Sequence, residues 1–258
     1  MAPPLQPDPP AGAPERGFGV AEIVEAAGAT ATALDIGCGS GRVTIALALA
    51  GAAATGVDTH AGRLADARDR AARAGVEATF VAADMDATLP FADAAFAAVT
   101  SRLALMIARD PVATLREAVR VVRPGGVVVT AVWARIEQNP WFGEPRAAVA
   151  AVLGRERAAF AGAFDRLGDA VELVDLHRRA GLADVQGGVL RDELHAPDAA
   201  AHWAHLTATI GHFSRLAAAL TPEQQRSLHA ALAERLAPLH RDGELRLGRA
   251  MVLVSGRR

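Results

Sequence analysis

The stretch Leu34-Asp35-Ile36-Gly37-Cys38-Gly39-Ser40-Gly41 decides the fold of this chain. The short apolar run 31–33 before it predicts a buried parallel strand, and the run 42–50 after it predicts a helix. A strand, a glycine turn and a helix in this order direct backbone N–H groups and the positive end of a helix toward a ligand. Three glycines at alternate positions allow a sharp turn, and they let a ligand lie directly against the backbone.

The spacing of the glycines indicates which kind of ligand the turn accepts. A dinucleotide fingerprint has glycines at relative positions 1, 3 and 6. Here the third glycine, Gly41, stands at position 5, and Arg42 occupies position 6. Asp35 also precedes the first glycine by two residues, where its carboxylate would repel a pyrophosphate. The turn therefore favours a ligand that carries no phosphate.

Composition narrows the functional classes. The 258 residues carry a net charge of −2 with no basic run, which argues against nucleic acid and membrane surfaces as partners. No apolar stretch reaches the length of a membrane span, and the N-terminus does not resemble a signal peptide, so a cytoplasmic location is expected. The single cysteine, Cys38, excludes an internal disulfide. Lysine and tyrosine are absent, so neither is catalytic, and the arginine- and alanine-rich composition suggests a bacterial source.

The rest of the chain alternates between strand and helix patterns, which predicts a parallel sheet. Residues 1–16 hold six prolines and predict a disordered tail, so we expect a single domain over 17–258. Asp110 and Pro111 cap a helix whose inward face is Val112, Leu115, Val119 and Val122. The expected strands are 53–58, 77–82, 94–101, 127–133, 184–194 and 249–256, and the other expected helices in this alternation are 18–27, 61–74 and 169–180.

Asp58 ends the second expected strand, 21 residues after Gly37, where a carboxylate can accept hydrogen bonds from ribose hydroxyls. Asp84 and Met85 follow the third strand, and Arg123-Pro124-Gly125-Gly126 precedes the fifth. With the acidic-x-Gly-x-Gly-x-Gly turn, these motifs resemble class I S-adenosylmethionine (SAM)-dependent methyltransferases. The likeness is greatest to the small-molecule branch that includes ubiquinone and menaquinone biosynthesis methyltransferases. One departure is Phe96-Ala97, where the family often has Phe-Asp.

The resemblance implies an α/β Rossmann-like fold. Its sheet would have seven mostly parallel strands, with one antiparallel strand near the C-terminus and a helical lid. It implies SAM as cofactor and S-adenosylhomocysteine as its product, with Asp84 accepting the adenine amino group beside Met85. The cofactor-binding residues that it implies are Asp35, Gly37, Cys38, Gly39, Gly41, Asp58, Thr59, Arg63, Asp84, Met85 and Ser101.

Two insertions, at about 134–168 and 195–243, interrupt the alternation at the carboxyl edge of the expected sheet, where open α/β folds bind ligands. We expect them to form a mostly helical lid. Thr221 begins a helix with a capping box, and its buried face is expected to hold Leu228, Leu232, Leu236 and Leu239. Candidate substrate-pocket residues are Trp133, Trp141, Phe142, Trp203 and Phe213, for which core packing is the alternative.

Three histidines are candidate general bases, because imidazole titrates near neutral pH. His202 and His205 are three residues apart and are expected to share a helix face, with His212 two turns beyond His205. The alternative is a polar stripe on a lid helix. No carboxylate completes a ligand set around them, so we expect no metal.

The tetrapeptide Asn139-Pro140-Trp141-Phe142 resembles the Asn-Pro-Pro-aromatic motif of methyltransferases that act on exocyclic base amines. It follows the fifth expected strand instead of the fourth, and it has tryptophan for the second proline. A nucleic-acid substrate is therefore disfavoured.

The sequence predicts methyl transfer from SAM to O, N or C of a small apolar or aromatic molecule, such as a secondary metabolite. A cyclase or pericyclase that keeps SAM as a structural part of its pocket is the alternative. A nicotinamide oxidoreductase and a non-enzymatic binding module are disfavoured, and the oligomeric state is not determined.

Overall fold

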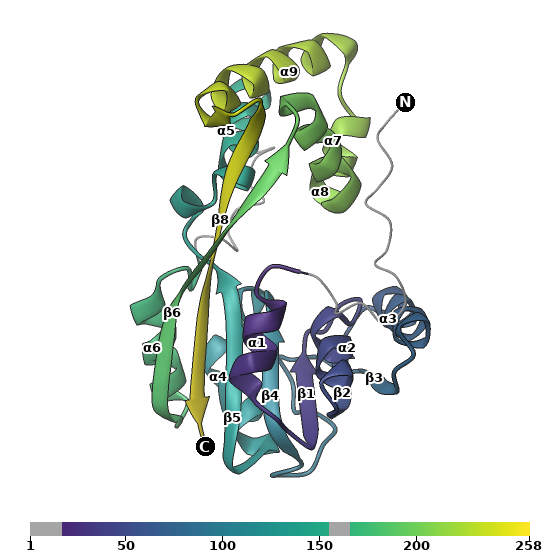
Figure 1. Cartoon of the computed structure of the whole chain (residues 1–258), viewed down its shortest axis with the longest axis vertical. Helices are drawn as coiled ribbons and strands as arrows, with labels where there is room; N and C mark the ends of the chain where they lie inside the picture. The colour runs from purple at the N-terminus through teal and green to yellow at the C-terminus, as the bar shows by residue number, and fades with distance from the viewer. Residues whose placement is uncertain (1–16, 155–165) are drawn as a thin grey trace. The chain divides into compact units, whose positions relative to one another are not determined.

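The computed structural model describes residues 17–154 and 166–258, so the predicted tail lies outside the described residues. The strands form one sheet in the order β3-β2-β1-β4-β5-β8-β6, and β7 pairs with β8 beside this path (Figure 1). The bounds of the strands are β1 Thr32–Ile36, β2 Ala53–Asp58, β3 Ala78–Ala82, β4 Phe96–Arg102, β5 Val122–Trp133, β6 Ala183–Ala196, β7 His240–Arg241 and β8 Glu244–Arg257.

Contacts divide the described chain into two compact units. The core unit comprises residues 17–133, 167–190 and 251–258, and the helical unit comprises 134–154, 166 and 191–250. The helices of the core unit are α1 Val20–Ala27, α2 Arg42–Leu49, α3 Ala61–Ala74, α4 Pro111–Val121 and α6 Ala170–Arg179. Those of the helical unit are α5 Pro140–Leu153, α7 Ala199–Thr209, α8 Gly211–Ala218 and α9 Pro222–Leu236.

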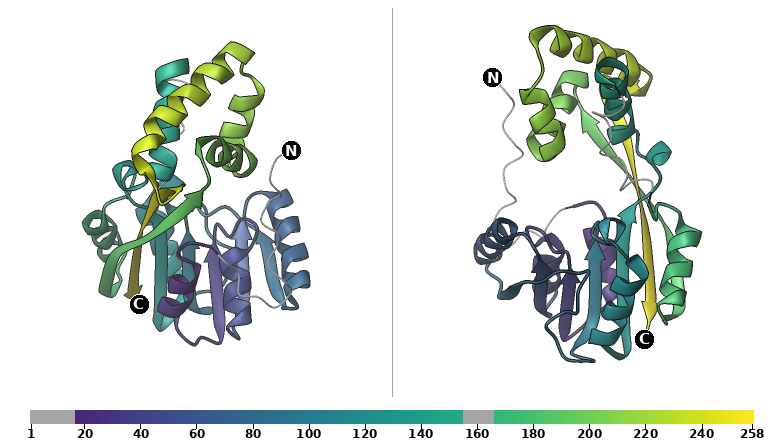
Figure 2. Two further views of the ribbon diagram at one scale, coloured as in Figure 1. Left: turned by 45° about the horizontal axis from the view of Figure 1, so that its top comes forward. Right: turned by 180° about the vertical axis from the view of Figure 1, so that it is seen from behind.

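The core unit has the predicted Rossmann-like sheet, with helices on both of its faces (Figure 2). Strands β1 to β5 pair in parallel, and β8 pairs antiparallel with β5. Four residues of β1 are buried, as a central parallel strand requires. Ile23 of α1, Val43 of α2 and Met251 of β8 pack in one apolar cluster with the sheet. The predicted fold class is therefore confirmed.

Two details of the core unit differ from the prediction. Helix α4 begins at the predicted Asp110 cap but ends at Val121, and Val122 belongs to β5. The prediction of Val122 on the inward face of the helix is wrong, because the residue before Pro124 disfavours helical backbone and the helix ends early. Val119 is half-buried, not fully buried. Where the family often has an acid after Phe96, the Ala97 N–H donates instead to the Thr32 hydroxyl (3.0 Å).

The helical unit is built around α9. Thr221 and Gln224 form the predicted capping box, and Leu228, Leu232 and Leu236 are buried. Leu239 lies beyond the helix, in a short 3₁₀ turn, and is only half-buried, so its predicted place on the buried face is wrong.

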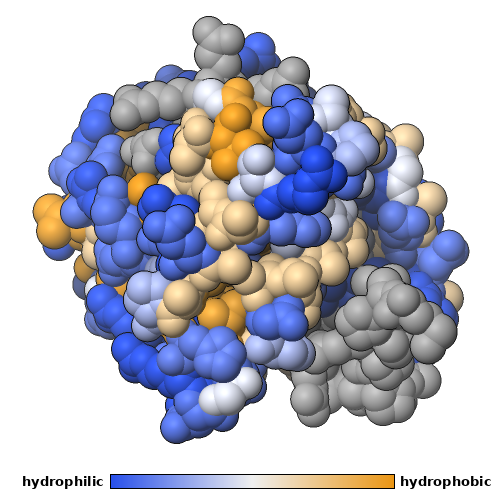
Figure 3. Space-filling view, turned by 90° about the horizontal axis from the view of Figure 1, so that it is seen from above, coloured by the Kyte–Doolittle hydropathy of each residue, from blue (hydrophilic) through white to orange (hydrophobic). Residues whose placement is uncertain are grey.

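The described surface offers few large apolar side chains. Leu49, Ile107 and Val171 are the exposed large hydrophobic residues of the described part of the chain. In Figure 3, strongly hydrophobic residues (orange) form only small groups among weakly hydrophobic and hydrophilic ones. Within residues 17–154 and 166–258, no helix is long and apolar enough to cross a membrane.

Candidate cofactor site

A cavity of about 790 Å³ lies at the carboxyl ends of the central strands in the core unit. Nine of the predicted cofactor residues line it, namely Asp35, Gly37, Cys38, Gly39, Asp58, Thr59, Arg63, Asp84 and Met85. The sequence analysis did not assign the other lining residues, which are Ser40, Arg42, Val43, Val57, His60, Asp66, Ala83, Asp86, Arg102, Leu103, Ala104 and Ile107.

The glycine turn brings the backbone to the cavity wall. Gly39 has φ +54, and a Cβ added there would meet no atom within 4 Å, so a ligand can approach the backbone closely. A Cβ on Gly37 would come within 2.2 Å of the Ala104 Cβ, which fixes the turn against the segment after β4. The turn therefore leaves room for a ligand at Gly39 and none for a larger residue at Gly37.

Asp58 is fixed beside this turn by two backbone groups. Its Oδ2 accepts from the Gly39 N–H (2.9 Å) and its Oδ1 from the His60 N–H (2.9 Å). A carboxylate has about four lone-pair sites, so both oxygens can still accept from a ligand hydroxyl. The His60 ring caps α3 by accepting from the Arg63 N–H (3.2 Å), which holds the rim of the cavity.

Asp35 is a buried carboxylate on the cavity wall. The Thr44 N–H and hydroxyl donate to its Oδ2 at 3.1 and 2.8 Å, and the Thr100 hydroxyl donates to its Oδ1 at 3.2 Å. Burial raises the pKa of Asp35 to about 6, while these hydrogen bonds and the nearby Arg102 charge act in the opposite direction. Asp35 is therefore ionised at neutral pH, close to its titration range.

Asp84 and Asp86 form a small acidic loop beyond β3. The Asp86 N–H donates to Asp84 Oδ1 (2.9 Å), and the backbone and Nε groups of Arg109 donate to the Asp86 carboxylate. Arg109 Nη2 also lies 3.5 Å from Asp84 Oδ2. This loop places Met85 at the cavity wall.

Two predicted cofactor residues do not line the cavity. A Cβ on Gly41 would meet Ala67 and Phe80 at 3.0–3.1 Å, so this glycine serves the packing of the turn against α3 and β3. Ser101 is buried on β4. Side chains alternate along a strand, so its neighbours Thr100 and Arg102 share the face toward Asp35, and Ser101 lies on the other face.

Arg102 is the most informative residue that the prediction missed. It ends β4, lines the cavity, and its Nε donates to the Phe18 carbonyl (3.0 Å). Side chains alternate along a strand, so Arg102 lies on the same face as Thr100, and this alternation could have revealed it. The Cys38 side chain has a packing role, because its Sγ lies against Gly56. Burial raises the pKa of its thiol, which keeps the thiol protonated.

The three candidate histidines occupy different environments in the helical unit. His202 is buried, its Nε2 donates to the Trp141 carbonyl (2.7 Å), and burial lowers its pKa to about 4. His205 lies three residues further along α7, so it neighbours His202 on the same side of the helix, but its side chain is exposed. His212 lies on α8, after a break at Ile210. The prediction of a continuous helix to His212 is wrong, because α7 ends at Thr209 and α8 begins at Gly211.

Four of the candidate aromatic residues form the interior of the helical unit. The ring centroids of Phe142 and Phe213 are 5.4 Å apart, and those of Trp203 and Phe213 are 5.3 Å apart. Trp141 packs on Phe142 at 5.6 Å, and all four side chains are buried. Trp133 belongs to the core unit, where its ring centroid lies 6.1 Å from that of Phe18.

Asn139 has a structural role in the helical unit. Its Nδ2 donates to the carbonyls of Ala134, Arg135 and Ala250, and its Oδ1 accepts from the Trp141 indole and the Ala250 N–H. The tetrapeptide that begins at Asn139 thus tethers β8 to the start of α5.

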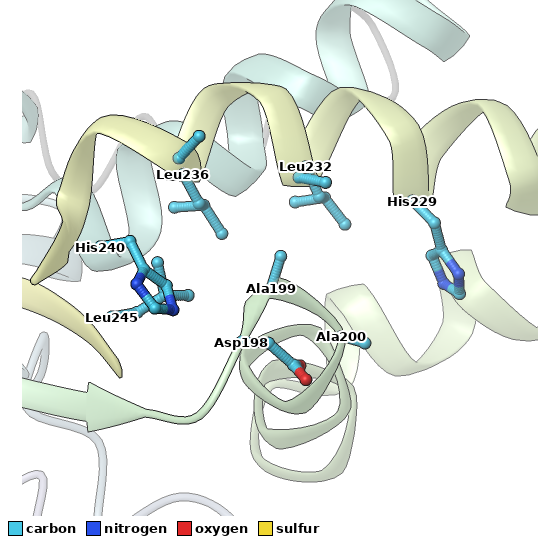
Figure 4. A pocket seen from close by; sticks show the side chains of 10 residues that line it. Asp198, Ala199, Ala200, His229, Leu232, Leu236, His240 and Leu245 are labelled. Atoms are coloured by element: carbon cyan, nitrogen blue, oxygen red, sulfur yellow. The ribbon is translucent and has the colours of Figure 1, made fainter. Parts of the chain in front are cut away.

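The helical unit also contains a cavity of about 410 Å³ between the start of α7 and α9 (Figure 4). Leu232, Leu236 and Leu245 line it, together with alanines, and His229 and His240 lie on its rim. None of the predicted substrate residues lines this cavity. Within the described residues, no group of three or more His, Cys, Asp or Glu side chains is placed to hold a metal ion.

Comparisons with known proteins agree with this architecture. Residues 34–130 match the family model described as a methyltransferase domain. A search of curated proteins found no match. Among solved structures, YcgJ from Bacillus subtilis has a TM-score of 0.61 at 19% identity, covering 93% of this chain and 97% of that one. A putative methyltransferase from Bacillus halodurans has a TM-score of 0.61 at 18% identity, covering 93% of this chain and 99% of that one.

A phosphoethanolamine N-methyltransferase from Haemonchus contortus, bound to S-adenosylhomocysteine and phosphomonomethylethanolamine, gives a TM-score of 0.58 at 16% identity. The match covers 94% of this chain and 53% of that one. The [4+2]-cyclase SpnF has a TM-score of 0.50 at 21% identity, covering 92% of this chain and 79% of that one. These likenesses concern the fold alone.

The matched stretch contains the glycine turn, Asp58 and Asp84, so this part of the chain is similar to class I methyltransferase domains, whose cofactor is SAM. The cavity residues fit SAM. The open face of Gly39 admits a ligand against the backbone, and Asp58 and Asp84 supply acceptors for hydroxyl and amino groups. No specific support emerges for the quinone-methyltransferase branch.

Proposed function

We propose that the chain transfers the methyl group of SAM to O, N or C of a small apolar or aromatic molecule. The observation that carries this proposal is the cavity at Gly39, where an open backbone position adjoins a fixed carboxylate, Asp58. SAM supplies an electrophilic methyl group. In the proposal, Asp58 holds the ribose hydroxyls and Asp84 the adenine amino group, while Met85 lines the ring. These residues act by orienting the cofactor, which is the main catalytic requirement for an activated methyl donor.

We assign selection of the substrate to the helical unit. Its apolar cavity, lined by Leu232, Leu236 and Leu245, supports an apolar substrate. Among the three predicted histidines we assign the role of general base to His205, whose pKa is lowered by burial of part of its ring and by the Arg249 charge. His202 donates its Nε2 proton to a backbone carbonyl, which suits a structural role.

The test is incubation with SAM and a panel of small phenols, amines and activated methylenes, followed by quantification of S-adenosylhomocysteine and product. One S-adenosylhomocysteine per methylated product supports the proposal. Product formed without S-adenosylhomocysteine would indicate the cyclase alternative instead.

Once a substrate is known, His205→Gln and His212→Gln test the assignment of the base. We expect His205→Gln to lower kcat about 100-fold without changing SAM affinity, and His212→Gln to leave both nearly unchanged. Equal rates in wild type and His205→Gln would remove the base from the account.

A further inference from the structure

The cavity between the start of α7 and α9 has a lining that suits one kind of ligand. Seven of its ten lining residues are alanine or leucine, and the other three are Asp198, His229 and His240. Leu232 and Leu236 project from α9 toward the start of α7 (Figure 4). The volume of about 410 Å³ lies in the range of small-molecule sites. The cavity therefore has room for the apolar body of a small molecule.

The floor of this cavity is fixed and its walls are open. Leu232, Leu236 and Leu245 are buried, so the packing of the helical unit holds the floor in place. Ala200 of α7 and Ala233 of α9 are exposed, and their short side chains leave the groove between the helices unfilled. A ring with a short side chain can lie on the leucines and reach the rim.

Asp198 gives the cavity its charge. Its Oδ1 caps α7 by accepting from the Ala201 N–H (2.7 Å). The described residues offer no hydrogen bond or ion pair to its Oδ2, and none of the described lining residues is an arginine. The two histidines are the other titratable groups that line the cavity. An apolar surface thus adjoins one carboxylate oxygen that can accept from a ligand.

We propose that this cavity binds the substrate by its apolar body and that Asp198 Oδ2 accepts a hydrogen bond from its ammonium group. The inference rests on the proposed function and gives that substrate a class, the small apolar amines. An ammonium supplies both N–H donors and the opposite charge, whereas a hydroxyl supplies one neutral donor and a carboxylate is repelled. Asp198 is then a specificity-determining residue.

An NMR titration of the full chain with phenethylamine, phenethyl alcohol and phenylacetate tests this inference without SAM or turnover. The three probes share one hydrocarbon body and differ in the terminal group. At pH 7.5 and low ionic strength the amine is cationic and the acid anionic. The imidazole signals of His229 and His240, assigned with His229→Gln and His240→Gln, report binding at this cavity. We expect the amine to bind about 5-fold or more tightly than the alcohol, and the carboxylate to bind most weakly.

Three variants locate the selection for charge. Asp198→Asn should remove the preference for the amine and leave the affinity for the alcohol nearly unchanged, because asparagine also caps a helix. Asp110→Asn, at the cap of α4 in the core unit, is the matched control and should keep the preference. Ala233→Leu fills the groove and should weaken the binding of all three probes.

Equal affinity for the amine and the alcohol in wild type would overturn the inference. Tighter binding of the carboxylate, unchanged signals of both histidines, or a preference that survives in Asp198→Asn would also overturn it. The wild-type comparison needs no variant, so a folding defect in Asp198→Asn does not remove the test. Failure of wild type to bind SAM, measured separately by calorimetry, would instead contradict the proposed function.

Discussion

The Asp35 carboxylate lines the candidate cofactor cavity, and its burial destabilises the core unit at neutral pH. It is buried beside the cavity and ionised at neutral pH, and burial raises its pKa to about 6 from 3.8. The folded state therefore binds a proton more tightly than the unfolded state does between pH 4 and 6. The contribution of this group to stability thus improves as pH falls through that window.

Asp35→Asn should remove this effect while keeping the local hydrogen bonds, because an amide oxygen can accept from Thr44 and the Thr100 hydroxyl can rotate toward the Leu34 carbonyl. We expect the stability advantage of the variant over wild type to shrink by about 2 kcal/mol between pH 7.5 and 4.5. Urea unfolding across this range measures it. Parallel curves for the two proteins would contradict the assigned pKa.

At the scale of elements, the turn after β3 is held in place by α4. Arg120 donates to the carbonyls of Leu89 and Phe91 and pairs with Asp93 and Glu117, and Glu117 accepts from the Leu89 N–H. Hydrogen bonds to the carboxylates of Glu117 and then Asp93 hold the pKa of Arg120 above its usual range.

Arg120→Met should lower the free energy of unfolding by about 1.5–3 kcal/mol, because it breaks charge-assisted hydrogen bonds and leaves the Leu89 and Phe91 carbonyls without this donor. Arg116→Met, on the exposed side of the same helix, is the control and should change stability by less than about 0.5 kcal/mol. Denaturant unfolding of both variants measures the difference, and equal values would exclude the anchoring role.

Asn139 anchors the helical unit in a comparable way. Asn139→Ala removes five hydrogen bonds at a fully buried position. We expect a loss of about 3 kcal/mol or more, because buried partners are left unsatisfied. Gln138→Ala, which removes one 3.4 Å contact, is the matched control. Thermal unfolding followed by tryptophan fluorescence should separate the two variants, and similar transitions would contradict a structural role.

At the scale of the whole molecule, each unit contains a buried histidine that stays neutral in the folded state. His177 accepts from the Thr130 hydroxyl and donates to the Leu173 carbonyl, and burial lowers its pKa to about 4. His202 has a similar pKa in the helical unit. Both stabilise the fold above pH 6.5 and lose this contribution as the pH falls toward 4.

Each of these histidines should lower the free energy of unfolding by about 2 kcal/mol as the pH falls from 7 to 5. The effect of Asp35 on stability has the opposite sign. His177→Gln keeps a donor and an acceptor, so its stability relative to wild type should rise by this amount as the pH is lowered. Guanidinium unfolding at both pH values measures the change. A constant difference between the proteins would refute the neutral, buried state of His177.

The sequence specified the core unit well because its signals are local. The Gly37–Gly41 turn, the Asp110 cap and the alternating strands each depend on neighbouring residues, and Asp58 lies at the predicted end of β2. Ser101 and Arg102 show where this reasoning stopped, since the direction of each side chain depends on the register of β4 with β1.

The helical unit was harder to predict, because its aromatic residues and histidines depend on tertiary packing. The sequence alone does not distinguish aromatic residues that bind a substrate from those that fill a core. The structure buries the side chains of Trp141, Phe142, Trp203 and Phe213. The break at Ile210 carries no proline, so the chain between His205 and His212 reads as one helix.

The central claim is that the cavity at Gly39 and Asp58 holds SAM. Calorimetry of wild type, Asp58→Asn and the control Asp69→Asn with SAM, S-adenosylhomocysteine and NAD tests it most directly. The account predicts that wild type binds both adenosyl ligands and does not bind NAD. The affinity for SAM should fall by about 10-fold or more in Asp58→Asn and stay unchanged in Asp69→Asn. Binding of NAD, or SAM affinity unaltered in Asp58→Asn, would contradict it.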